Sequence, residues 1–154
     1  MVDVGEVMPD VAMQGADGAV IRPGDFAGRK AVLFFYPKDD TPGCTTENLD
    51  FTAMADDFAA AGVALLGISK DPPAKHAKFA AKHGLTVPLA SDPVEDGLAD
   101  ALGIWVQKSM YGRTYMGMER TTYLLDTDGR IARVWRKVKV KGHAAEVLEA
   151  AQAL

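Results

Sequence analysis

The chain has 154 residues, a length that suits one domain with a substantial core, and 48% of its residues are hydrophobic while 25% are charged. Its formal net charge of -4 gives no reason to expect nucleic acid or an anionic membrane surface as a partner, and no apolar run approaches the ~20 residues of a membrane-spanning helix. One cysteine rules out an internal disulfide and the first residues do not resemble a signal peptide, so we expect a single domain, residues 1–154, in the cytoplasm.

The first long strand is predicted over Ala31–Tyr36, after a preamble of short strands and turns. Residues 11–13 and 19–21 flank a turn and indicate a small hairpin. The six apolar residues of Ala31–Tyr36 are too few for a helix and rich in strand formers. Pro37 has no N–H to donate to a sheet, so it closes the strand.

A helix is predicted from Thr41 to about Ala61. Thr41 is a good N-cap, and Pro42 suits the first helical position because its missing N–H would have no partner there. An apolar stripe with helical spacing marks the buried face of this helix, and it consists of Phe51, Met54 and Phe58.

The strand predicted over Val63–Ser69 completes a parallel strand–helix–strand unit with a right-handed crossover. Ligand sites in such sheets lie beyond the carboxyl ends of the strands, where the helix that starts at Thr41 also begins. The elements predicted next are a helix over about 73–83, a short strand over 87–90, a short helix over 92–102, two antiparallel strands over 121–126 and 131–135 joined by an Asp-Gly turn, and a last helix over 144–154.

Three further features carry weaker signals. His76 and His83 share a face of the helix over 73–83, but no third ligand is near, so we interpret them as a solvated face and expect no metal site. The aromatic and sulfur-rich segment 104–119 is the least regular part, and it lines the substrate approach, forms a partner surface or covers a sheet edge. The basic residues within 133–141 indicate a solvated strand face rather than a nucleic-acid site.

Cys44 falls three residues after Thr41 and therefore in the first turn of the predicted helix. There its sulfur faces free backbone N–H groups and the positive end of the helix dipole, which favours an anion. Thiols in such positions are commonly ionised at neutral pH, and the thiolate is the form that attacks electrophiles. A lone cysteine is more often an inert core hydrophobe, but the Thr-Pro-Gly punctuation before Cys44 argues against a mid-core position.

Residues 35–47 read Phe-Tyr-Pro-Lys-Asp-Asp-Thr-Pro-Gly-Cys-Thr-Thr-Glu. This segment resembles the peroxidatic signature of peroxiredoxins, Pro-x-x-x-Thr-x-x-Cys. The full sequence of this segment is similar to that of the peroxiredoxin Q, or bacterioferritin comigratory protein, branch. The segments 67–72 and 117–126 extend the resemblance over nearly the whole chain. It implies an α/β, thioredoxin-like fold, with a central mixed sheet flanked by helices.

The resemblance implies peroxide reduction, in which a thiolate attacks one oxygen in line and the other leaves as water or alcohol. Cys44 is then the nucleophile, and the hydroxyl of Thr41 hydrogen-bonds the sulfur and the peroxide. The N–H groups of Gly43 and Cys44 hold the developing charge, and Pro37 shields the pocket from water.

A cation is also required, and arginine suits it because it is always charged and presents a planar fork of donors. Periodicity does not choose among the arginines of this chain. The resemblance selects Arg120, just before the strand over 121–126, and it gives Glu47 the role of orienting Arg120.

The reacted sulfur becomes a sulfenic acid, with which a second thiol must condense. Many relatives have a resolving cysteine five residues on, where this chain has Leu49, and others place it in the third helix. The chain therefore resembles a one-cysteine peroxiredoxin, recycled without a cofactor by thioredoxin, glutaredoxin or glutathione. The resemblance suggests a monomer, and a dimer is the alternative.

Two other functions compete with this one. A dithiol oxidoreductase needs Cys-x-x-Cys, and Thr41 or Glu47 stands wherever the second cysteine would be, so this function is excluded. A non-enzymatic redox sensor or holdase has one feature in its favour, the aromatic segment 104–119.

Overall fold

The computed structural model describes residues 2–154 and contains one large sheet of seven strands in the order β2-β1-β5-β4-β3-β8-β9. Its strands are β1 (Met13–Gly15), β2 (Val20–Ile21), β3 (Lys30–Phe35), β4 (Val63–Ser69), β5 (Leu89–Ser91), β8 (Thr121–Leu125) and β9 (Ile131–Trp135). A separate hairpin consists of β6 (Trp105–Met110) and β7 (Arg113–Met118). The helices are the 3-10 turn η1 (Pro23–Phe26), α1 (Pro42–Ala53), α2 (Ala55–Ala60), α3 (Pro73–His83), α4 (Leu98–Leu102) and α5 (His143–Ala153). None of these helices is long and apolar enough to cross a membrane.

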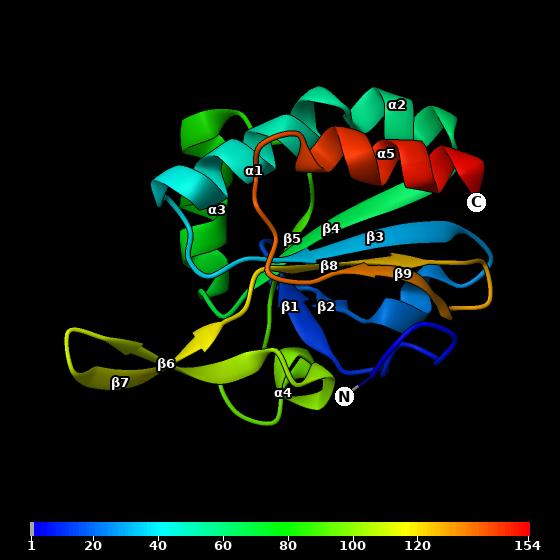
Figure 1. Ribbon diagram of the computed structural model, residues 1–154. Helices are drawn as coiled ribbons and strands as arrows, with labels where there is room; N and C mark the ends of the chain where they lie inside the picture. Colours follow the sequence, from blue (N-terminus) through cyan, green and yellow to red (C-terminus); the bar gives the residue numbers. More distant parts are fainter. Residues whose placement is uncertain (1) are drawn as a thin grey trace.

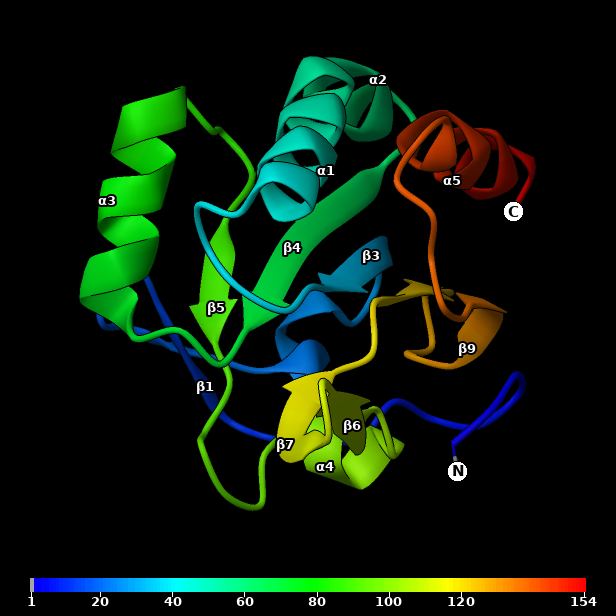
Figure 2. The same cartoon turned by 60° about the vertical axis from the view of Figure 1, so that its left-hand side comes forward.

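The predicted mixed sheet flanked by helices is confirmed. β3 lies inside the sheet between β4 and β8, parallel to β4 and antiparallel to β8, and β4 is parallel to β5. Helices α1, α2 and α5 cover one face and α4 lies on the other (Figure 1), while α3 stands beside β5 (Figure 2). The first long strand reads as continuously apolar because both of its faces are buried.

The side chains of β3 alternate between two hydrophobic cores. Val32 and Phe34 face the core that also holds Cys44 and the rings of the helical layer. Leu33 and Phe35 face the core on the α4 side. The site that follows β3 is therefore anchored from both faces of the sheet.

The helix predicted from Thr41 to about Ala61 is interrupted at Met54, which has φ -103° and ψ 6° and separates α1 from α2. Its N–H bonds to the carbonyl of Phe51, as in a tightened helical turn. Phe51 and Phe58 are both fully buried with ring centroids 5.9 Å apart. The bend keeps both rings in one core while the chain turns toward β4.

The helix predicted over 92–102 is shorter than expected and forms only at Leu98–Leu102. Asp92 is instead a distant cap, because its carboxylate accepts the N–H groups of Leu98 and Ala99 at 2.7 and 3.0 Å. A Cβ on Gly97 would lie 2.6 Å from this carboxylate, so the capping geometry requires glycine there.

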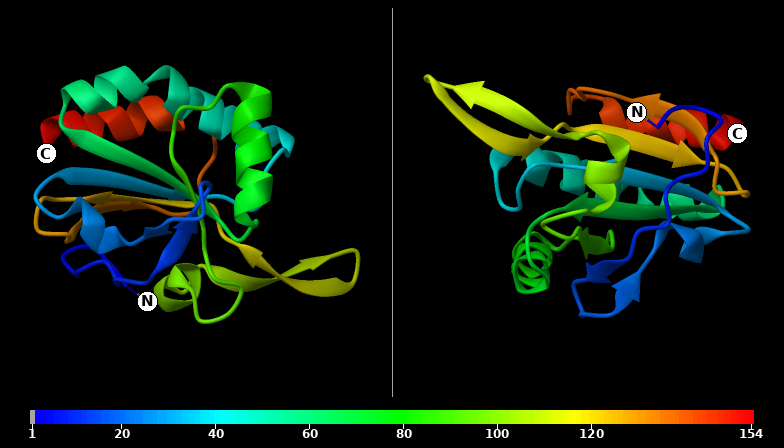
Figure 3. Two further views of the ribbon diagram at one scale, coloured as in Figure 1. Left: turned by 180° about the vertical axis from the view of Figure 1, so that it is seen from behind. Right: turned by 90° about the horizontal axis from the view of Figure 1, so that it is seen from below.

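The irregular segment predicted over 104–119 forms the hairpin β6–β7, which we call the arm and define as residues 105–118. Its strands pair with each other and with no strand of the large sheet in the described part of the chain. The arm projects from the body on the side where α1 begins (Figures 1 and 3). Met118 at its base is buried in the core on the α4 side, and Trp105 packs against the same core.

Candidate active site

Cys44 lies beyond the carboxyl end of β3, as the sequence indicates. β3 ends at Phe35, a loop follows, and α1 begins at Pro42. Thr41 has the extended conformation of an N-cap (φ -96°, ψ 153°), and its carbonyl accepts the N–H of Thr45 at 2.9 Å. Cys44 is thus in the first turn of α1, and it is only 1% exposed.

Arg120 reaches the sulfur from the segment between β7 and β8. The antiparallel register places Phe35 opposite Thr121, so Arg120 lies beside the end of β3. Its Nη2 donates to Cys44 Sγ at 3.4 Å and its Nη1 donates to Glu47 Oε1 at 2.6 Å. The structure thus brings together Cys44, Glu47 and Arg120, three residues that the sequence analysis selected.

Gly43 leaves room for the guanidinium. A Cβ at this position would lie 3.4 Å from Arg120 Nη2, at the edge of tight contact. The absence of a side chain therefore lets the guanidinium lie against the first turn of α1, beside the backbone N–H groups that the sequence analysis selected.

Glu47 and Arg120 form a coupled, largely buried ion pair. Burial raises the pKa of Glu47 to about 7, against the opposing attraction of Arg120. Burial alone would lower the pKa of Arg120, but the charges of Glu47 and Cys44 outweigh it and raise the pKa. Arg120 therefore stays cationic beside the sulfur. Oε2 of Glu47 is buried and has no hydrogen-bond partner among residues 2–154.

Thr41 and Pro37 are placed differently from Arg120. The hydroxyl of Thr41 donates to the carbonyl of Lys38 at 2.8 Å rather than to the sulfur. This bond orients the hydroxyl so that its oxygen lone pairs are left as acceptors. Pro37 is exposed on the loop between β3 and α1.

A buried polar network lies behind the Cys44 loop, and the sequence analysis missed it. We call Tyr36, Asp39, Asp71 and His76 the Asp39 cluster. The Asp39 carboxylate accepts the Tyr36 hydroxyl at 2.6 Å and contacts His76 Nδ1 at 2.6 Å, while the backbone N–H of Asp39 donates to Asp71 at 2.8 Å. Burial raises the pKa of Tyr36 far above its usual range, so this phenol remains a donor.

His76 is fully buried, so its interpretation as part of a solvated helix face is wrong. Its Nε2 donates to the carbonyl of Ala90 at 3.0 Å, because a carbonyl can only accept. The start of α3 packs against the end of the sheet, whereas His83 near its other end is partly exposed and contacts Asp40 at 2.8 Å. Helical spacing alone cannot separate the two histidines. The only local sequence signal for these contacts was the pair of adjacent acids, Asp39 and Asp40, in the loop before Cys44.

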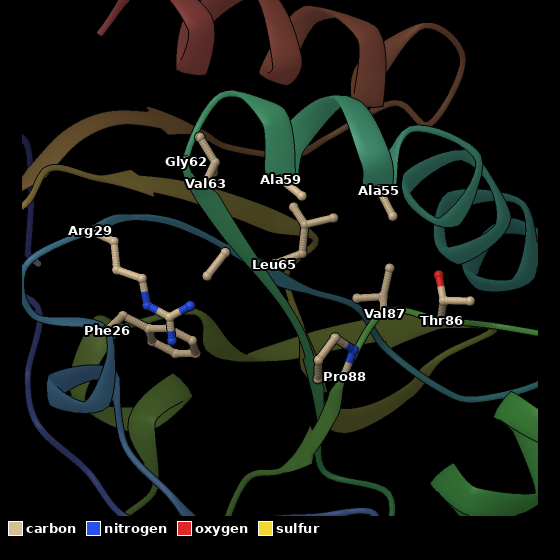
Figure 4. A pocket seen from close by; sticks show the side chains of 11 residues that line it. Phe26, Arg29, Ala55, Ala59, Gly62, Val63, Leu65, Thr86, Val87 and Pro88 are labelled. Atoms are coloured by element: carbon tan, nitrogen blue, oxygen red, sulfur yellow. The ribbon is translucent and has the colours of Figure 1, made fainter.

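The cavity in Figure 4 is separate from this site. It has a volume of about 540 Å³ and lies between α2, β4 and the segment that precedes β5. Its lining is mainly apolar, includes Arg29, and contains none of the residues around Cys44. With no nucleophile or acid–base pair in its lining, this cavity is not assigned a reaction.

A buried thiol in the first turn of a helix, contacted by an arginine beyond the carboxyl end of β3, defines a cysteine-based oxidoreductase. The model of the AhpC/TSA family matches residues 4–134. The chain belongs to this family.

Relatives with known names agree over nearly the full length. The chain is 44% identical to peroxiredoxin Bcp of Bacillus subtilis over 148 residues, covering 96% of this chain and 94% of the relative. It is 37% identical to peroxiredoxin Bcp of Escherichia coli over 144 residues, covering 94% and 92%. These relatives are peroxiredoxins, so the protein is a thiol-dependent peroxidase that uses a peroxidatic cysteine.

Solved structures give the same result. A bacterioferritin comigratory protein of Xanthomonas campestris superposes with a TM-score of 0.90 at 42% identity, covering 98% of each chain. A peroxiredoxin Q of Xylella fastidiosa, solved as a Cys-to-Ser mutant, superposes with a TM-score of 0.92 at 35% identity, covering 99% of this chain and 97% of that one. The predicted thioredoxin-like fold and the predicted peroxiredoxin Q branch are both confirmed.

Proposed function

We propose that the protein reduces hydrogen peroxide and organic hydroperoxides to water and alcohols through Cys44, as an antioxidant enzyme of the cytoplasm. The observation that carries this proposal is the contact of 3.4 Å between Arg120 Nη2 and the sulfur of the only cysteine. The Xanthomonas relative supports organic peroxides as substrates, because its structures are described as informing on alkyl peroxide reduction by that protein.

The reaction begins when the Cys44 thiolate attacks one oxygen of the peroxide. A sulfur–oxygen bond forms, the O–O bond breaks, and its electron pair goes to the leaving oxygen, which takes a proton from the solvent and departs as water or alcohol. Arg120 and the backbone N–H groups of Gly43 and Cys44 stabilise the charge on the leaving oxygen. A free lone pair of the Thr41 hydroxyl oxygen accepts a hydrogen bond from the peroxide O–H group, and Glu47 holds Arg120 in place.

The sulfenic acid left on Cys44 is then reduced by an outside thiol, since the chain has one cysteine. The first thiol forms a mixed disulfide with Cys44 and releases water. A second thiol takes the first one as a disulfide and restores the Cys44 thiol. Thioredoxin, glutaredoxin or glutathione can supply these thiols to a protein that we propose to be a monomer, with a dimer as the alternative.

Stopped-flow tryptophan fluorescence on the reduced protein tests the first step. Hydrogen peroxide and tert-butyl hydroperoxide should each give a fast bimolecular phase. The phase should be absent in Cys44→Ser and slowed by about 10²-fold or more in Arg120→Ala, the usual range for loss of a charge-stabilising donor. Arg133→Ala is the matched control, because Arg133 pairs with Glu146 on the surface. A Cys44 that reacts no faster than a free thiol would refute the proposal.

A non-enzymatic redox sensor or holdase is the second candidate, and the exposed arm is the observation that favours it. A sensor passes its oxidation to a partner and need not turn over. Steady consumption of peroxide in the presence of excess dithiothreitol, beyond one equivalent per Cys44, would exclude this candidate.

A further inference from the structure

The arm is joined directly to the candidate active site. β7 ends at Met118, and only Glu119 separates it from Arg120, whose guanidinium contacts the Cys44 sulfur. The arm extends away from the body on the side where α1 begins (Figures 1 and 3). A molecule bound along the arm would therefore be held beside Cys44.

The surface of the arm is apolar and cationic. Its exposed large apolar residues are Met110, Tyr111, Tyr115 and Met116, and Tyr111 at the tip is 97% exposed. Residues 105–118 include Lys108 and Arg113 but no aspartate or glutamate, in a chain with a net charge of -4. The pairing of the two strands puts Met110 and Tyr115 on one face with Lys108 and Arg113, next to Tyr111 at the tip, whereas Met116 lies on the opposite face. An exposed apolar group of this kind on a projecting element is typical of an interaction surface. Its charge favours a partner that is acidic around the contact.

The chemistry of Cys44 indicates which partner is needed. The oxidised sulfur must meet a thiol from another molecule, because the chain has no second cysteine. Cys44 is 1% exposed, so a donor must be held close while the surrounding residues move to admit its thiol. Binding on an adjacent arm would raise the effective concentration of the donor at Cys44.

We propose that the arm is the docking surface for a dithiol protein of the thioredoxin type that reduces oxidised Cys44. This inference rests on the proposed function. The partner meets the arm with an apolar patch rimmed by acidic residues around its own reactive thiol. Its thiolate attacks Cys44 Sγ and the hydroxyl leaves with a proton as water. Its second thiol then attacks the mixed disulfide, so the partner departs as an internal disulfide and Cys44 returns to the thiol.

The test uses the full chain with three arm substitutions, Met110→Thr, Tyr111→Asn and Tyr115→Thr, at the tip and on the face that also carries Arg113. Tyr111 has φ 52°, and asparagine tolerates this left-handed conformation, so the hairpin is kept while the apolar surface is removed. Val20→Thr is the control, because Val20 is 65% exposed on the edge strand β2.

Peroxide turnover is measured with thioredoxin, kept reduced by its reductase and NADPH, and separately with dithiothreitol. In the triple variant we expect kcat/KM for thioredoxin to fall by about 10-fold or more, as expected when the apolar centre of an interface is removed. Turnover with dithiothreitol and the peroxide reaction of reduced Cys44 should stay within about twofold of the wild type, as should every rate of Val20→Thr.

A charge variant gives an independent measure. Arg113→Glu should lower kcat/KM for thioredoxin, and raising the salt from about 0.05 to 0.3 M should lower it for the wild type more than for this variant, because salt screens charges across an interface. The rate with uncharged dithiothreitol should show neither effect.

Several results would overturn the docking proposal. Equal loss with thioredoxin and dithiothreitol would mean that the arm acts by placing Arg120, and no loss would mean that the donor binds elsewhere. A wild type that turns over with dithiothreitol but not with thioredoxin or glutaredoxin would remove the docking proposal and leave the peroxidase intact. If sedimentation shows a dimer that the triple variant abolishes, the arm binds a second copy. If reduced Cys44 does not react rapidly with peroxide, both proposals fall.

Discussion

The Asp39 cluster and the arm flank Cys44 and differ in almost every physical respect. In the cluster, Asp39 and His76 are buried and joined by a contact of 2.6 Å that ties the Cys44 loop to α3. In the arm, the strands pair only with each other among residues 2–154, and the tip is exposed. A peroxidase needs its thiol held still for reaction with peroxide and open to a donor afterwards. Here the buried Asp39 cluster holds the loop that carries the thiol, and we assign the binding of the donor to the arm.

The largest effect is expected when the buried cluster is broken. Asp39→Ala removes the short contacts with the buried Tyr36 hydroxyl and His76 Nδ1 and leaves these two groups only their long contact of 3.5 Å with each other, which should lower the free energy of unfolding by about 3–5 kcal/mol. Asp39→Asn should recover more than half of this loss, because its amide oxygen can accept from Tyr36 while its NH2 donates to His76. Urea unfolding measures both.

The neighbouring acid provides the control. Asp40 contacts His83 and Lys82 on the surface, so Asp40→Asn should leave the unfolding midpoint unchanged. If Asp39→Ala unfolds at the same urea concentration as the wild type, the cluster does not hold the loop.

The next largest effect is expected from changing the planar guanidinium of Arg120, which donates to two groups at once. Lysine keeps the charge, but one ammonium cannot reproduce the planar pair of contacts with Cys44 and Glu47. Arg120→Lys should therefore lower the second-order rate constant with peroxide by about 10–100-fold, less than Arg120→Ala. Stopped-flow fluorescence measures the rate, and thermal unfolding checks that the fold is kept. A lysine variant as fast as the wild type would show that charge alone suffices.

A smaller effect should appear as pH dependence at Glu47. The pKa of Glu47 is about 7 in the folded protein, raised from the 4.5 of a freely solvated glutamate chiefly by burial. Between these two pH values the folded protein holds a proton that the unfolded chain has released, so the free energy of unfolding decreases as the pH rises. The contribution is at most about 3 kcal/mol.

Glu47→Gln keeps the shape of the side chain and an acceptor for Arg120 but does not titrate. Its free energy of unfolding, measured in urea at several values between pH 5 and pH 8, should therefore lack this decrease. Parallel curves for the two proteins would mean that Glu47 is ionised throughout this range, as a strong ion pair with Arg120 would make it.

Local signals in the sequence were enough to predict the strands and the helix that position Cys44. The apolar run Ala31–Tyr36, the cap at Thr41 and the apolar strand Val63–Ser69 each carry their own pattern, and the structure confirms all three. Patterns of this kind depend on neighbouring residues, so they are visible before the fold is known. Arg120 needed the family resemblance, because its contact with Cys44 joins residues 76 positions apart.

The features that were missed depend on tertiary contacts. The break at Met54 follows from fitting Phe51 and Phe58 into one core, which helical spacing does not reveal. The burial of His76 depends on Asp39, a residue 37 positions away on another element. The arm has the composition of a buried segment, and only the strand pairing shows that it lies outside the large sheet.

The smallest effect is expected at the tip of the arm. Tyr111 is 97% exposed, so Tyr111→Asn removes almost no buried area and keeps a residue suited to φ 52°. The free energy of unfolding should change by less than about 0.5 kcal/mol, the usual range for such surface sites. Urea unfolding at neutral pH measures it beside Asp39→Ala. A loss above about 1 kcal/mol would show that the ring packs against something in solution, and the contrast between a rigid cluster and a free arm would then fail. If stability is unchanged, any defect of the arm variants with thioredoxin must come from lost contacts with the donor rather than from a weakened fold.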